Sequence, residues 1–211
     1  MSEKIILSKN DIDILREKVR PYYTEKRMVH TLAVEKEAEK LGRIYIPEEI
    51  ERLRAAALLH DITKKADEKK QLQYCEEFGI IVRTDDMLSP SVFHAITGAA
   101  VAERDFSDFA DSEIISAVRW HTTGRAGMTV FESIIYLADY IEETRDFEDC
   151  VRLRTYFYDR ISQGDDPYAV LRDTMVYSFD MTISMLVSDG ALIDCGTVSA
   201  RNYFVAERKL G

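Results

Sequence analysis

Residues 53–65 have the sequence LRAAALLHDITKK, in which five consecutive apolar residues lead directly into His60 and Asp61. The composition of this run predicts a buried helix that ends at the His-Asp pair. An ionised aspartate buried beside a histidine is unfavourable unless another group compensates its charge. A metal ion bound by the two side chains would compensate it, so we interpret the pair as part of a metal site.

The other histidines also lie in runs with helical periodicity, and a second aspartate follows the apolar run SIIYLA at residues 133–138. The residues that we expect to bind metal are His30, His60, Asp61, His94, His121 and Asp139. Imidazole and carboxylate groups suit divalent transition metals such as iron, manganese, zinc or nickel. The set is large enough for two ions that share Asp61 as a bridge. Such a site favours metal-assisted hydrolysis, with phosphate esters or anhydrides as the expected substrates.

The rest of the chain is predicted to be helical almost throughout. The expected helices cover residues 9–20, 24–41, 47–60, 67–78, 90–103, 111–121, 130–142, 147–162 and 167–188. Ser8 is a candidate N-cap for the first of them, and Gly42 is a candidate stop for the second. Thr129 and Glu132 form the T-x-x-E pattern of a capping box.

Length and composition predict a single all-α domain. The chain has 211 residues, of which 46% are hydrophobic, and contains 11 tyrosines and 9 phenylalanines, enough to build a substantial core. We expect a compact helical bundle with a buried metal site. Its core would extend over about residues 24–145, with C-terminal helices at about 147–205 packed on it. The only candidate strands are residues 80–84 and 191–195.

The formal charge of −10 and a pI near 5.0 argue against binding of nucleic-acid polymers, which requires a basic face. A small anionic substrate remains compatible if positive charge gathers at the site. The sequence shows neither a signal peptide nor an apolar run of membrane-spanning length. Cys75, Cys150 and Cys195 are far apart, so we expect reduced thiols in a cytoplasmic protein.

Two cations lie close to the candidate metal ligands in the sequence. Arg27 precedes His30 by three residues and would share its helix face. Lys64 follows Asp61 by three residues and could neutralise charge on a transferring phosphoryl group. Both side chains also fit an ordinary role as solvated surface charges.

The segment HTTGR at residues 121–125 supplies Thr122, a flexible backbone at Gly124 and the guanidinium of Arg125, a combination suited to phosphate binding. An ordinary helix end with a glycine stop is the alternative. Arg145 follows the next predicted helix and could turn back over the site as a second anion contact. Tyr140 and Glu142 are expected to lie off the functional face of that helix, in structural roles.

The order of these residues resembles the HD-domain metal-dependent phosphohydrolases. The strings KRMVH, ALLHDITK, HAITGA, HTTGR, YLADYIE and SARN are similar to the YqeK family, the symmetrical bis(5′-nucleosyl)-tetraphosphatases of bacteria. The resemblance extends over about residues 10–205. The GYP string of the cyclic-dinucleotide branch and the HDIGH string of the deoxynucleotide triphosphohydrolases are absent from the sequence.

The resemblance implies an HD-type helical bundle in which a metal-bound water cleaves diadenosine tetraphosphate into two ADP. Iron is the implied metal, with manganese as an alternative. The ligands of the principal ion would be His30, His60, Asp61 and Asp139. A second ion, or the phosphates, would be bound by His94 and His121. The implied catalytic residues are Asp61 and Lys64. Contacts with the substrate are implied for Arg27, Lys64, His94, His121, Thr122, Arg125, Arg145 and Thr197.

The sequence leaves two other functions open. The same metal site would serve a phosphatase or phosphodiesterase that acts on other nucleotides, and it would also serve a nucleotide-binding regulator without turnover. A cation beside the metal favours an enzyme, because a regulator needs no group that stabilises charge in a transition state. The number of metal ions, the base preference and the formation of a homodimer are not determined by the sequence.

Overall fold

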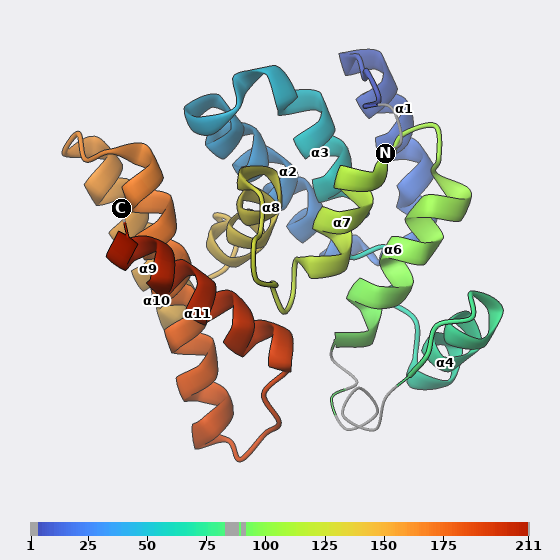
Figure 1. Ribbon diagram of the computed structural model, residues 1–211. Coiled ribbons are helices and arrows are strands. Elements are labelled where there is room, and N and C mark those ends of the chain that lie inside the picture. Colours follow the sequence, from blue (N-terminus) through green and yellow to red (C-terminus); the bar gives the residue numbers. More distant parts are fainter. Residues whose placement is uncertain (1–3, 83–88, 90–91, 211) are drawn as a thin grey trace.

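The computed structural model describes residues 4–82, 89 and 92–210, and within this part of the chain every regular element is a helix (Figure 1). The α-helices are α1 (Lys9–Val19), α2 (Glu25–Tyr45), α3 (Ile50–Leu59), α4 (Glu68–Glu77), α6 (Phe93–Asp105), α7 (Ser112–Trp120), α8 (Val130–Ile141), α9 (Glu148–Ser162), α10 (Pro167–Ser188) and α11 (Cys195–Leu210). Short 3-10 helices occur at Arg20–Tyr22 and Pro47–Glu49. The prediction of an all-α fold is confirmed.

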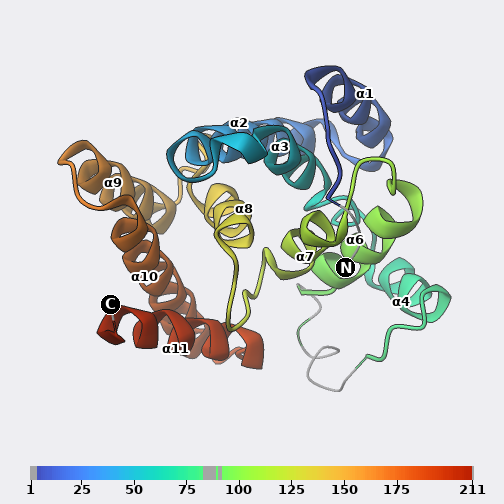
Figure 2. The same cartoon turned by 45° about the horizontal axis from the view of Figure 1, so that its top comes forward.

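The helices form two groups that meet at α8. In the first group α2 packs against α3 and α8, while α6, α7 and α8 pack in succession. In the second group α10 packs against α9 and α11, and it also contacts α2 and α8. Figure 2 shows α9, α10 and α11 together on one side of the molecule, with α1, α4 and α6 on the other. None of the helices in the described part combines the length and apolar character required to cross a membrane.

Both predicted strands are wrong where the structure describes them. Residues 80–82 and 191–194 are irregular, and Cys195 begins α11, a helix missing from the predicted set. An apolar run becomes a strand only when a neighbouring strand pairs with its backbone, and the described part of the chain contains no strand. Residues 83–84 of the first candidate, and the predicted helix start at residue 90, lie outside the described residues.

The capping predictions are confirmed at the start of α1 and α8. Ser8 and Asp11 form a reciprocal capping box, and so do Thr129 and Glu132. Each box satisfies backbone N–H groups that have no partner within the helix. The second box therefore fixes the start of α8, the helix that carries Asp139.

The predicted stop at Gly42 is wrong, because α2 continues to Tyr45. Gly42 is buried against α3, where a Cβ atom would lie 2.6 Å from Cδ1 of Leu53. The glycine therefore allows close approach of two helices and does not end the first one. A glycine in a helical run carries either meaning, and only the neighbouring helix distinguishes them.

A buried ion pair joins α3 to α7. Arg52 donates hydrogen bonds to Asp111 from Nε (2.9 Å) and Nη2 (2.8 Å), and both side chains are buried. Asp111 also caps α7 by accepting hydrogen bonds from the backbone N–H groups of Glu113 (3.0 Å) and Ile114 (3.1 Å). This bidentate geometry fixes the relative position of the two helices whose C-terminal ends carry His60 and His121.

Gly124 connects the two groups of helices. Its φ of 66° lies in the left-handed region, and a Cβ atom there would approach Phe179 of α10 to 2.7 Å and Ala200 of α11 to 3.1 Å. The sequence suggested a flexible phosphate cradle at this position. In the structure Gly124 is a buried packing residue, and its missing side chain makes room for α10 and α11.

We expect Gly124→Ala to destabilise the protein by about 2–4 kcal/mol, because the left-handed backbone and the clash with Phe179 both oppose a Cβ atom. Urea unfolding measures this difference. Gly190→Ala is the matched control, because Gly190 has a φ of 63° and nothing within 4 Å of a Cβ atom. The control should lose only about 1 kcal/mol. Equal losses in the two variants would contradict the packing role of Gly124.

Candidate metal centre

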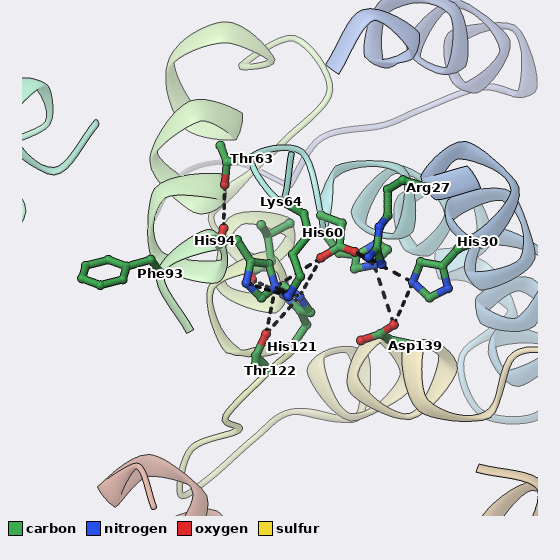
Figure 3. Close-up of polar contacts among 12 residues, drawn as sticks. Arg27, His30, His60, Thr63, Lys64, Phe93, His94, His121, Thr122 and Asp139 are labelled. Carbon is green, nitrogen blue, oxygen red and sulfur yellow. Dashed lines mark hydrogen bonds and ion pairs between the residues drawn. The ribbon is translucent and has the colours of Figure 1, made fainter. Parts of the chain in front are cut away.

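The six predicted metal ligands come together at the junction of α2, α3, α6, α7 and α8. Figure 3 shows His30, His60, His94, His121 and Asp139 in one cluster, while Phe93 points away from it. His60 is the C-cap residue of α3 and His121 that of α7, so two helix ends point into the cluster. Two groups in the described part of the chain have ligand atoms within 4.8 Å of one another, His30 with His60 and Asp139, and His60 with Asp61 and His121.

The two carboxylate oxygens of Asp61 face different histidines. Its Oδ2 lies 3.4 Å from Nε2 of His60 and 3.9 Å from Nε2 of His30. Its Oδ1 lies 3.2 Å from Nε2 of His94 and 3.6 Å from Nε2 of His121. The carboxylate thus lies between two pairs of imidazoles, and these side chains would be the ones to hold metal at the cluster.

Backbone carbonyls orient two of the imidazoles. Nδ1 of His60 lies 2.7 Å from the carbonyl oxygen of Ala57, and Nδ1 of His121 lies 2.7 Å from that of Val118. A carbonyl only accepts hydrogen bonds, so each Nδ1 carries the proton. Each Nε2 then presents its lone pair to the cluster, which is the orientation that metal-binding histidines adopt.

The donor set fits a transition metal ion. His60 has no solvent-exposed surface, and its Nε2 makes no hydrogen bond to any residue in the described part of the chain. A buried acceptor without a partner loses free energy relative to its hydrated state. A cation at this nitrogen would supply the partner, and the surrounding imidazole and carboxylate groups are suitable further ligands.

His30 lies between two carboxylates. Its Nε2 is 3.0 Å from Oδ1 of Asp139, and its Nδ1 is 3.0 Å from Oε1 of Glu142. Burial opposes protonation of His30, but hydrogen bonds to these carboxylates raise its pKa to about 9. The same negative potential attracts a metal cation. The prediction that Glu142 lies off the functional face is therefore wrong. Its position three residues after Asp139 is the sequence signal that could have placed both on one helix face.

His94 is held differently from the other histidines. Burial lowers its pKa to about 4, despite the nearby carboxylate of Asp61. Its backbone carbonyl accepts a hydrogen bond from Oγ1 of Thr63 (2.9 Å), which joins the turn after α3 to α6. Oγ1 of Thr122 lies 3.2 Å from Nε2 of His94 and 3.1 Å from Nε2 of His121. The predicted residue Thr122 therefore lies at the site.

Three cations surround the cluster. Arg27 pairs with Oδ2 of Asp61 (2.8 Å), and Arg145 pairs with Oδ1 of Asp139 (2.6 Å). Burial raises the pKa of Asp139, but Arg145 and the neighbouring histidines hold it well below its usual value. Nζ of Lys64 lies 3.1 Å from Nδ1 of His94, and protein packed around the ammonium lowers its pKa, although the residue as a whole remains exposed.

A cavity of about 670 Å³ opens onto the cluster. The residues that line its polar end are Arg27, Asp61, Lys64, His94, His121, Thr122, Asp139 and Arg145. The remaining lining residues come from α8, α9, α10 and the α8–α9 turn, and are Tyr136, Tyr140, Phe147, Glu148, Asp149, Cys150, Thr182 and Met185. Tyr140, expected to have a structural role, therefore contributes to the cavity.

Two residues predicted to contact substrate lie elsewhere. Arg125 pairs with the buried carboxylate of Glu132 at 2.8 Å and does not line this cavity. Thr197 is buried in the first turn of α11, where its backbone N–H bonds to the carbonyl of Asp194. In the structure Arg125 therefore forms an ion pair, and Thr197 belongs to a helix start.

Comparisons with known proteins agree on one family. The model of the HD domain family matches residues 27–144. A symmetrical bis(5′-nucleosyl)-tetraphosphatase of Halalkalibacterium halodurans is 30% identical, over 90% of this chain and 95% of that protein. One of Staphylococcus aureus is 31% identical, over 81% of this chain and 85% of its own length. A crystal structure from Clostridium acetobutylicum, described as a "predicted HD superfamily hydrolase involved in NAD metabolism", has a TM-score of 0.81 and 31% identity, and covers 92% and 97% of the two chains.

We expect the metal-depleted protein to be most stable near pH 6.5. His30 has a pKa of about 9 in the folded state against an ordinary value of 6.5, so its contribution is complete below pH 6.5 and is lost as the pH rises to about 9. His94 has a pKa of about 4, so the unfolded chain binds more protons and stability falls as the pH falls below 6.5. Each of these two losses in the free energy of unfolding amounts to at most about 3 kcal/mol.

Urea unfolding of chelator-treated protein measures the loss of stability at both acid and alkaline pH. The range from pH 4.5 to 9.5 is about the span of the two pKa values. His30→Gln is the control for the loss of stability at alkaline pH, because glutamine does not titrate. The expectation fails if the variant loses as much stability above pH 7 as the parent does, and if that loss is at least as large as the contribution of one surface ion pair.

Proposed function

The chain belongs to the HD domain family, and from this premise we propose that it is a metal-dependent hydrolase that cleaves diadenosine tetraphosphate symmetrically into two ADP. One observation carries the proposal. Asp61 lies between two pairs of imidazoles in a cavity whose lining also includes the aromatic side chains of Tyr140 and Phe147. The names of relatives that align over most of both chains support the choice of substrate.

The protein would hold a divalent transition metal at the cluster, with iron as the proposed ion and manganese as the alternative. The proposed ligands are His30, His60, Asp61 and Asp139, with His94 and His121 for a second ion. The bound metal would supply Lewis acidity and lower the pKa of a water for attack on phosphorus. The carboxylates and imidazoles of the chain would hold that charge at the cluster.

Arg27, Lys64 and Arg145 would bind the phosphate chain. All three line the cavity, and together they concentrate positive charge in a protein whose formal charge is −10. A substrate with four phosphates would otherwise be repelled by the net charge. Fixed cations at the site also offset the negative charge that accumulates on the phosphoryl group during transfer.

The aromatic and apolar side chains that line the cavity would bind one nucleoside. Tyr140, Phe147 and Met185 present flat or polarisable surfaces on which a base can pack, and Thr182 adds a hydroxyl. The proposed nucleoside contact is therefore here, and not at Thr197 as the sequence predicted. A nucleoside held there, with its second phosphate at the metal centre, places the central anhydride at the reacting position. Cleavage there leaves a nucleoside diphosphate on each side.

Product analysis tests the proposed function. Protein loaded with iron or manganese under reducing conditions is incubated with diadenosine tetraphosphate, and ADP should be the only product. ATP with AMP, or released inorganic phosphate, would contradict symmetrical cleavage. The absence of turnover would favour a nucleotide-binding regulator. Asp61→Ala should lose both activity and most of the bound metal, because its carboxylate contacts four imidazoles.

Lys64→Ala should lower kcat by about a hundredfold, the typical effect of removing one preorganised electrostatic group. Its metal content should remain that of the parent, because an ammonium does not ligate a cation. Steady-state kinetics and elemental analysis measure the two quantities. Lys65→Ala is the matched control, since Lys65 is the exposed neighbour and does not line the cavity. An unchanged kcat in the Lys64 variant would assign Lys64 to the solvated surface.

A further inference from the structure

Glu142 is a fully buried glutamate that follows the last residue of α8. Its Oε1 lies 3.0 Å from Nδ1 of His30 and accepts a hydrogen bond from Oγ1 of Thr144 (2.8 Å). Its Oε2 accepts a hydrogen bond from the backbone N–H of Thr144. Both oxygens of the carboxylate therefore have partners from the protein itself.

The carboxylate of Glu142 contacts the metal centre at His30. An ionised carboxylate only accepts hydrogen bonds, so Nδ1 of His30 carries the proton and Nε2 faces Asp139, 3.0 Å away. His60 and His121 use backbone carbonyls for the same purpose. Unlike His60 and His121, His30 has a carboxylate at Nδ1, and a single substitution can remove that partner.

The turn that carries Glu142 is itself held by α9. Nη1 of Arg154 donates to the carbonyl of Glu142, and Nη2 donates to the carbonyl of Arg145, both at 2.7 Å. Arg145 in turn contacts Asp139 at 2.6 Å. One guanidinium thus fixes both ends of the turn, and the turn positions a partner of His30 together with a partner of Asp139.

We propose that Glu142 is a positioning residue of the metal centre, which holds the Nδ1–H of His30 so that Nε2 is directed at the metal ion. Thr144 and Arg154 hold the carboxylate and its turn in place. A charged acceptor also increases the basicity of the imidazole and so strengthens its bond to a metal. The inference deepens the proposed function and rests on its assignment of His30 as a ligand.

Zinc binding by the metal-depleted protein tests this role without any assay of hydrolysis. Titration with Zn²⁺ against a competing chelator should show a Kd that is about 10–100 times higher in Glu142→Ala than in the parent, the range for loss of a carboxylate behind a metal-binding histidine. Glu143→Ala is the matched control, because this neighbouring glutamate pairs with Lys36 at the surface. It should bind zinc like the parent.

A double-mutant cycle with His30→Ala separates positioning from general stability. If Glu142 acts through His30, Glu142→Ala should cause no further loss of zinc affinity in the His30→Ala background. An equal loss in both backgrounds would overturn the proposal, as would an unchanged Kd in the single variant. A parent protein that binds zinc normally but shows no hydrolysis would instead count against the proposed function.

Milder variants keep the test decisive if Glu142→Ala fails to fold. Glu142→Gln preserves the volume of the side chain, but its amide nitrogen cannot accept the hydrogen bond from the backbone of Thr144. Thr144→Val removes the hydroxyl at an exposed position. Both should retain the parent's circular dichroism and bind zinc more weakly than the parent. Parent-like affinity in both folded variants would overturn the proposal.

Discussion

The carboxylate of Asp61 is the feature on which the site depends. Its side chain is 4% exposed, and a negative charge so deeply buried is unfavourable unless positive or polarisable groups surround it. The ends of α3 and α7 and the inner faces of α2 and α6 supply those groups as four imidazoles and Arg27. The position of these helices must therefore satisfy charge compensation at their junction as well as packing of the apolar core.

The same carboxylates serve two kinds of cation in the proposed function. Arg27 and Arg145 contact Asp61 and Asp139, which are also proposed metal ligands. A metal ion that shares these carboxylates would reduce their hold on the guanidinium groups, which would then be available to phosphate oxygens. Metal loading and substrate binding would thus be linked through ordinary electrostatic competition.

The second group of helices gives the metal centre its substrate-sized cavity. The HD domain match ends at residue 144, whereas α9 and α10 provide many of the remaining lining residues of the cavity. Close packing around Gly124 connects this group to the turn after His121. Arg154 connects it to the turn that holds Glu142. The chemistry and the shape of the site therefore come from different parts of the chain.

The sequence by itself determined the helical class and the caps at Ser8 and Thr129, because each depends on residues within a few positions of one another. It also identified the candidate ligands by residue type and order, but their assembly from positions 30 to 139 depends on the packing of the helices. The tertiary structure alone decided the role of Gly42, the pairing of Arg125 with Glu132 and the contact of His30 with Glu142, 112 positions away. Helix α11 and the irregular residues 191–194 belong with these, since neighbouring helices select their conformation. A pattern specifies which face of a helix is apolar or charged, whereas the partner that meets this face is selected by packing and charge in three dimensions.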